Sequence, residues 1–130
     1  MRDHRKLRAF ELADRLAVEV YRLTAGFPKS EQFGLTAQMR RAAVSVASNI
    51  VEGCARHTEA DFLHFLDVAY GSCRELGYQL SLAFKLEFSK RQTHEAVFET
   101  CEETAKVLNG LLHAFRKKES GVWSPESGGR

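Results

Sequence analysis

The 130-residue sequence is poor in the residues that define several protein classes: it has 2 prolines, 3 cysteines and 1 tryptophan. An odd number of cysteines without a CxxC spacing argues against a disulfide framework and against a zinc ribbon. Cys54, Cys73 and Cys101 each follow the apolar pattern around them, so the sequence predicts three small core residues in a protein kept in a reducing compartment.

The sequence also lacks a long apolar run and a large net charge. No stretch approaches the ~20 apolar residues of a membrane span, and no basic and apolar leader opens the chain, so we expect a cytoplasmic protein without a membrane contact. Its 19 basic and 17 acidic residues give a net charge of +2. Binding to nucleic acid would therefore depend on a local patch of charge.

The sequence has the apolar periodicity of an α-helix over four segments, residues 7–25, 35–54, 59–86 and 90–117. No segment keeps the alternation of a β-strand. Four helices of similar length with short connections predict an all-α, antiparallel up-down-up-down four-helix bundle over residues 1–118. Serine, glycine and proline dominate residues 119–130, which predicts a disordered C-terminal tail.

Local signals place the helix ends and the buried faces. Pro28 ends the first helix, and Thr58 is predicted to cap the third helix. Ser89 and Gln92 have the spacing of a capping box at the start of the fourth helix. Gly71, inside the third helix, is predicted to allow a close helix–helix contact. The residues predicted to share the inward face of the first helix are Phe10, Ala13, Leu16, Ala17, Val20, Tyr21 and Thr24.

A metal site is one interpretation of the predicted start of the third helix. Cys54, His57, Asp61 and His64 lie at helical spacings there. However, His57 falls in the predicted turn, and no repeated ligand motif supports a site. We therefore predict a solvated helix start, and we expect no metal and no cofactor.

Polar residues interrupt the apolar faces of the second and third helices, and they allow two interpretations. One is a small enzyme that uses Asn49, Glu52 and Glu75. The other is a structural network that sets the register of the two helices. In this network Arg41 pairs with Glu75 across the helices. If that pair is buried, removing Glu75 would lower the free energy of unfolding strongly. No serine is matched with a histidine as a nucleophile would require, so we favour a non-enzymatic protein. The predicted network comprises Arg40, Arg41, Ser45, Asn49, Glu52 and Glu75.

The predicted topology brings basic residues together at one end of the bundle. Acidic residues dilute this patch, and a mixed, solvated surface is the alternative interpretation. In a ring of subunits the patch would be repeated and could hold a phosphate backbone without regard to sequence. The predicted nucleic-acid-binding residues are Arg2, Arg5, Lys6, Arg8, Arg56, Arg116, Lys117 and Lys118.

Two segments resemble the signatures of a known family. Residues 45–53 read S-V-A-S-N-I-V-E-G, similar to the S-I-x-x-N-I-x-E-G signature of the four-helix bundle proteins associated with intervening sequences in bacterial 23S rRNA genes. Residues 69–80 read A-Y-G-S-C-R-E-L-G-Y-Q-L and resemble that family's A-x-G-S-x-x-E-L-x-x-Q-L segment. The resemblance spans residues 7–115, with Ala47 in place of the usual proline and Val51 in place of the usual alanine.

The resemblance implies a four-helix bundle that assembles as a homopentamer. The family is also similar in fold to the accessory protein of diversity-generating retroelements, a basic pentameric bundle that binds nucleic acid and a reverse transcriptase. The hypothesis is a self-assembling scaffold for RNA, DNA or a nucleic-acid-processing protein, and a purely protein-binding adaptor is the alternative. Aromatic residues beyond the needs of one core agree with assembly: Phe33, Tyr70, Tyr78, Phe88 and Phe98.

Overall fold

The computed structural model describes residues 2–120, and the side chains of residues 2–117. All four predicted helices are present, and the fourth runs on to Ser120 instead of ending at residue 117. The rest of the predicted tail, residues 121–130, lies outside the described residues. Two short 3-10 helices join the four α-helices, in the order η1 His4–Lys6, α1 Arg8–Thr24, η2 Lys29–Glu31, α2 Leu35–Cys54, α3 Glu59–Lys85 and α4 Arg91–Ser120.

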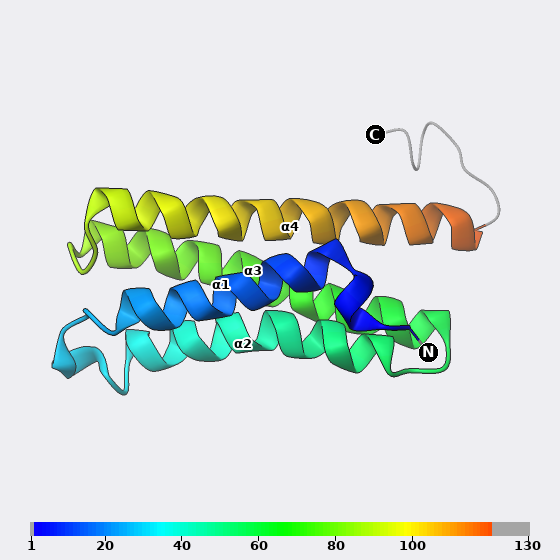
Figure 1. Ribbon diagram of the computed structural model, residues 1–130, viewed down its shortest axis with the longest axis horizontal. Helices are drawn as coiled ribbons and strands as arrows, with labels where there is room; N and C mark the ends of the chain where they lie inside the picture. Colours follow the sequence, from blue (N-terminus) through cyan, green and yellow to red (C-terminus); the bar gives the residue numbers. More distant parts are fainter. Residues whose placement is uncertain (1, 121–130) are drawn as a thin grey trace.

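The four helices form the predicted up-down-up-down bundle, in which each helix runs opposite to the one before it (Figure 1). Helix α1 packs against α2 and α4, and α3 packs against the same two helices, with the most extensive contact between α2 and α3. Helices α2 and α4 therefore lie across the diagonal of the bundle. No helix within residues 2–120 has the length and apolar character to cross a membrane.

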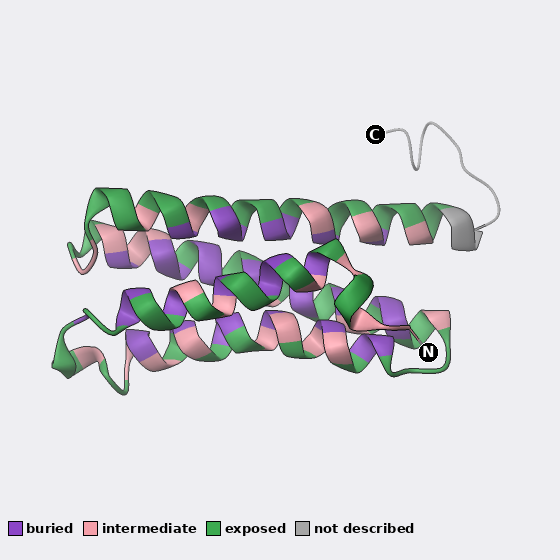
Figure 2. Cartoon of the chain, in the orientation of Figure 1, coloured by how far each residue is buried: buried purple, intermediate pink, exposed green. Residues whose placement is uncertain are grey.

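The core runs the length of the bundle between the helices (Figure 2). Its burial supplies the main driving force, at ~25 cal/mol for each Å² of apolar surface removed from water. The prediction for Tyr21 was wrong: its side chain is 46% exposed, whereas Leu12 is fully buried. Tyr21 lies at the edge of the apolar stripe, where the Arg40 guanidinium stacks 4.5 Å from its ring centroid. The largest fully buried side chains include Phe62, Leu16, Met39, Ile50, Leu66, Leu76, Leu80 and Leu108.

The two predicted caps have different outcomes. The Thr58 hydroxyl accepts a hydrogen bond from the Asp61 N–H at 3.1 Å, which confirms the cap of α3. The capping box at Ser89 was wrong, because α4 begins at Arg91 and the Ser89 hydroxyl is buried without a partner.

The turn before α4 explains why Ser89 cannot cap the helix. Glu87 has a φ of 64°, and the Phe88 N–H donates to the Ala83 carbonyl at 2.9 Å. This is the six-to-one bond of a Schellman motif, here with glutamate in the left-handed position that glycine usually occupies. Ser89 follows directly, and its hydroxyl group is buried in this turn.

The close contact between α2 and α3 depends on glycine at one position. A Cβ atom at Gly53 would lie 3.0 Å from Phe65 Cβ and 3.2 Å from the Phe62 carbonyl oxygen, so the two helices meet here without room for a side chain. The prediction for Gly71 was wrong, because that residue is exposed and a Cβ atom there would meet nothing within 4 Å.

Candidate functional site

Three segments that contain predicted basic residues lie at one end of the bundle. The chain start, the turn between α2 and α3, and the last turns of α4 lie together there (Figure 1). The Arg2 N–H donates to the Cys54 carbonyl at 2.8 Å, which fixes the start of the chain to the end of α2. We call this region the basic end. The Lys118 side chain lies outside the described residues.

Each arginine of the basic end is already paired with a carboxylate. Four of these pairs have N–O distances between 2.7 and 3.5 Å. The hydrogen bonds from Arg5 also hold the pKa of Asp3 below its usual value. Lys6 differs from these arginines, because it is exposed and forms no salt bridge with residues 2–117. The pairs are Arg2–Glu59, Arg5–Asp3, Arg8–Glu11, Arg56–Glu52 and Arg116–Asp67.

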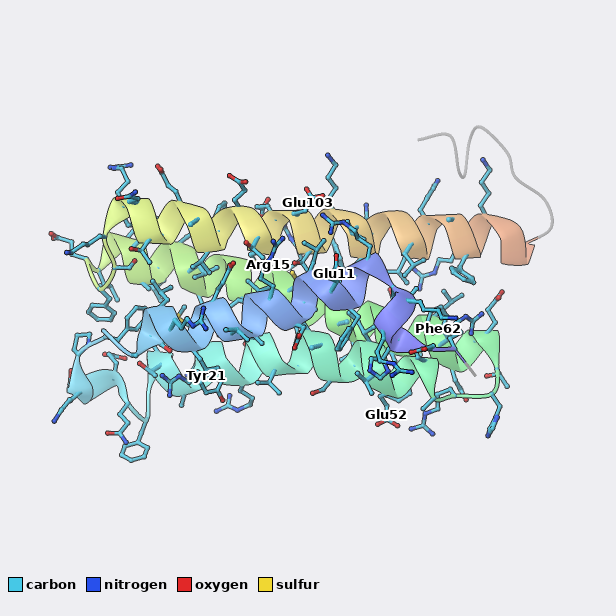
Figure 3. All side chains as sticks on the ribbon, in the orientation of Figure 1. Glu11, Arg15, Tyr21, Glu52, Phe62 and Glu103 are labelled. Atoms are coloured by element: carbon cyan, nitrogen blue, oxygen red, sulfur yellow. The ribbon has the colours of Figure 1, made fainter. Side chains whose placement is uncertain are left out.

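Arg2 also has a structural role that the sequence did not reveal. Its guanidinium carbon lies 4.0 Å from the centroid of the Phe62 ring and 5.2 Å from that of Phe115. The two rings pack edge to face at 5.3 Å. Arg2 thus closes the core at the basic end, near the labelled Phe62 in Figure 3. Nothing in sequence spacing links these three residues, because they come from three separate segments.

Part of the predicted polar network exists, between α2 and α3. The Asn49 side-chain amide donates to the Ser45 carbonyl at 2.8 Å and to the Ser45 hydroxyl at 3.0 Å. The Ser45 hydroxyl in turn shares a 2.8 Å hydrogen bond with the hydroxyl of Ser72 on α3. This small cluster fixes the register of the two helices. Ser72 was not among the predicted members, although its helical position near small residues was a signal.

The other predicted members do not join that cluster. The Arg40 guanidinium reaches α1 instead, where it donates to Thr24 Oγ1 at 2.8 Å and to the Tyr21 carbonyl at 3.2 Å. Arg41 is exposed and forms no salt bridge with any residue from 2 to 117.

The predicted pair between Arg41 and Glu75 was wrong. Glu75 is exposed, because it precedes the fully buried Leu76 and therefore projects from another side of α3, and its carboxylate accepts from Gln79 at 3.2 Å. The large cost expected for removing a buried glutamate therefore does not apply to Glu75.

The side chains of the hypothetical enzyme site do not converge. Asn49 bonds to Ser45, Glu52 to Arg56 and Glu75 to Gln79, each within its own helical segment. Within residues 2–117, no group of three or more histidine, cysteine or acidic side chains is arranged to hold a metal ion.

A groove at the opposite end of the bundle exposes several apolar side chains. It has a volume of about 590 Å³ and is formed by the end of α1, the η2 connector and the start of α2. Phe33, Tyr21 and Val44 line it and are 90%, 46% and 42% exposed. Arg40 and Arg41 lie beside them. Of the five extra aromatic residues, Phe33 and Tyr78 are exposed, whereas Tyr70, Phe88 and Phe98 pack partly against the core.

Comparison of the sequence with known protein families shows the family to which the chain belongs. The family model described as 23S rRNA-intervening sequence protein matches residues 5–110. The chain belongs to this family. A crystal structure from Bacteroides thetaiotaomicron, of a protein with unknown function from the S23 ribosomal protein family, is similar with a TM-score of 0.74 over 80% of this chain and 94% of that one. At 24% identity this similarity shows the fold. No curated protein matches the chain.

The two signature segments of this 23S rRNA-intervening sequence family member meet in the structure. Ser45 and Asn49 come from the first segment and Ser72 from the second, and they form the α2–α3 cluster described above. Gly53 ends the first segment at a point where α2 and α3 leave no room for a side chain. These signature positions therefore have a packing explanation, which requires no catalytic role.

Proposed function

We propose that this protein is a non-enzymatic, self-assembling scaffold in the cytoplasm. The observation that carries the proposal is the exposed apolar groove of Phe33, Tyr21 and Val44. A water-exposed phenylalanine beside two other apolar side chains costs solubility, and such patches mark surfaces that bind other proteins. The absence of convergence among Asn49, Glu52 and Glu75 supports a non-enzymatic role.

The occupant that we propose for the groove is a second copy of this chain. Arg41, which forms no salt bridge with residues 2–117, gives the groove a positive charge. On the far side of the bundle, α4 exposes Glu99 and Glu103, which form no salt bridge with any side chain from 2 to 117. Tyr21 and Glu103 mark these two sides in Figure 3. Complementary charges on opposite sides favour a head-to-tail contact, which closes into a ring when the rotation between subunits allows it. The number of five subunits rests on the family resemblance.

Phe33→Ala should weaken assembly without unfolding the chain, because the side chain is almost fully exposed in one subunit. We expect multi-angle light scattering at micromolar concentration to show an oligomer for the unmodified protein and a shift toward the 14.7 kDa monomer for the variant. Tyr78→Ala is the matched control, since it removes an exposed aromatic ring outside the groove and should leave the mass unchanged. A monomeric mass for the unmodified protein would contradict assembly, and an unchanged mass for Phe33→Ala would contradict the groove as its interface.

Sequence-independent binding of RNA or DNA at the basic end is the second candidate function. It is supported by the topology, which brings three segments that contain basic residues to one end of the bundle (Figure 1). Their carboxylate partners weaken the patch in one subunit. However, exposed ion pairs contribute only ~0–1 kcal/mol, so a phosphate could replace a carboxylate at little cost. Assembly would repeat the patch around an axis and add the fields of its lysines.

Replacing Arg5 and Lys6 together by glutamate should weaken this binding and reduce its dependence on salt, because fewer counterions would be released. Replacing Lys85 and Lys90 by glutamate at the opposite end is the control with the same change of charge. Gel shifts with single-stranded RNA and duplex DNA at ~50 and ~200 mM salt measure both effects. Equal losses in the two variants, or no retardation by the intact oligomer, would contradict this function and favour a protein partner.

A further inference from the structure

Two buried cysteine sulfurs lie in contact between α3 and α4. The Sγ atoms of Cys73 and Cys101 are 3.9 Å apart. Each sulfur also lies near the backbone carbonyl oxygen of the other residue, at 3.4 Å from Cys73 Sγ to Cys101 O and 3.5 Å from Cys101 Sγ to Cys73 O. Both side chains are 1% exposed. This reciprocal arrangement means that the two backbones, and not only two flexible side chains, hold the sulfurs together.

The sulfur pair lies beneath a groove, and a glycine without a side chain leaves only a thin layer of protein between the groove and the sulfurs. A Cβ atom at Gly77 would be 3.8 Å from Cys101 Sγ, and Gly77 itself lines a groove of about 400 Å³ between α3 and α4. Arg74 and Glu102 also line the groove and are joined by an exposed 3.5 Å ion pair. Such an exposed pair opens at little cost. A small oxidant can therefore approach the sulfurs through a local opening at Gly77.

We propose that Cys73 and Cys101 form a peroxide-sensitive dithiol that closes reversibly into a disulfide between α3 and α4. The Cys73 thiol releases its proton to solvent, and the thiolate attacks one oxygen of hydrogen peroxide, which breaks the O–O bond and leaves a sulfenic acid and hydroxide. The Cys101 sulfur then attacks the sulfenic sulfur and expels its hydroxyl group. The Cys101 proton joins that hydroxyl as water, so two thiols are oxidised and one peroxide is reduced to two waters.

The assignment of the two roles follows from the hydrogen bond between the sulfurs. This bond lowers the pKa of Cys73, because it stabilises a thiolate there, and it raises the pKa of Cys101. The thiolate is the nucleophile in such reactions, so the lowered pKa favours Cys73 as the first to attack, and the reciprocal geometry gives the same disulfide if Cys101 attacks first. A disulfide requires an S–S distance of about 2.05 Å, so each sulfur must move by about 1 Å.

Cys54 provides the matched control for this pair. It is as buried as the other two cysteines, its pKa is raised by burial, and within residues 2–117 its sulfur forms no hydrogen bond with another cysteine. The full-length protein is treated with hydrogen peroxide under native conditions, and its intact mass and non-reduced peptides are measured. We expect the mass to fall by two hydrogen atoms in the unmodified protein and in Cys54→Ala, with the peptides of Cys73 and Cys101 linked. Cys73→Ala and Cys101→Ala should not show this loss.

Reduction by dithiothreitol should restore the original mass and lower the melting temperature, because the disulfide constrains the unfolded chain. The unmodified protein and Cys54→Ala test the inference even if a cavity at Cys73 or Cys101 prevents folding of those variants. Three results would overturn it: addition of oxygen without loss of hydrogen, a linked peptide that contains Cys54, or a link that forms in urea and not in the folded protein.

Discussion

Gly53→Ala is expected to destabilise the bundle by about 1–2 kcal/mol, although alanine favours a helix over glycine by up to ~1 kcal/mol. The added methyl group would lie 3.0 Å from Phe65 Cβ and 3.2 Å from the Phe62 carbonyl oxygen. Neither atom is the flexible end of a side chain, so α2 and α3 must separate to admit it. That separation loosens the most extensive helix contact of the bundle. Urea denaturation, followed by circular dichroism, measures the change.

Gly71→Ala is the matched control within α3. A Cβ atom there meets nothing within 4 Å, so only the conformational term applies. We expect this variant to be more stable than the unmodified protein by ~0.5–1 kcal/mol, because alanine loses less backbone entropy in a helix. If both variants shift the urea midpoint in the same direction, the close contact at Gly53 is not what limits the approach of the two helices.

Phe62→Ala should cost about 3–5 kcal/mol, the largest effect that we expect from a single substitution. The Phe62 side chain is fully buried and packs edge to face on Phe115 at 5.3 Å. Its removal leaves a cavity, and it also removes the ring face on which the Arg2 guanidinium rests at 4.0 Å. The Arg2 contact with a π face adds ~0.5–1 kcal/mol at a partly exposed position. The start of the chain should therefore loosen along with the core.

Phe65→Ala provides the comparison, because it removes the same side chain one turn later on α3. The Phe65 ring is half-buried and carries the Arg56 guanidinium at 4.9 Å. We expect a cost of about 1–2 kcal/mol, since less apolar area returns to water. Thermal unfolding of both variants, with protease cleavage near Arg5 as a second measurement, tests the difference. Equal costs for the two substitutions would contradict Phe62 as the anchor of the basic end.

The sequence predicted the helices well because their signals are local. Apolar periodicity and the Thr58 cap act over a few residues, and both are seen in the structure. The prediction for Tyr21 failed because a side chain at the edge of an apolar stripe can lie either in the core or in solvent. The Ser89 capping box failed for a related reason: the Schellman turn at Glu87 set the path of the chain before α4 began.

The candidate site was predictable in location but not in contacts. Antiparallel topology alone places Arg2, Arg56 and Arg116 at one end, and the structure confirms that placement. Which carboxylate each arginine meets depends on the register and rotation of neighbouring helices, and sequence periodicity does not give these quantities. The pair Arg41–Glu75 failed for this reason. The contact between Cys73 and Cys101 was missed for the same reason, because each cysteine was read as an isolated core residue.

The anchoring of Arg2 to Cys54 has a practical consequence for where the molecule can be modified. The first described residue and the last turns of α4 both lie at the basic end (Figure 1). A tag or partner domain placed next to Arg2, or directly after the last turns of α4, would thus crowd the surface proposed for nucleic acid and leave the Phe33 groove unobstructed. A fluorophore on the η2 connector would do the reverse. The two ends of the bundle can therefore be blocked independently, and each proposed contact can be probed while the other stays accessible.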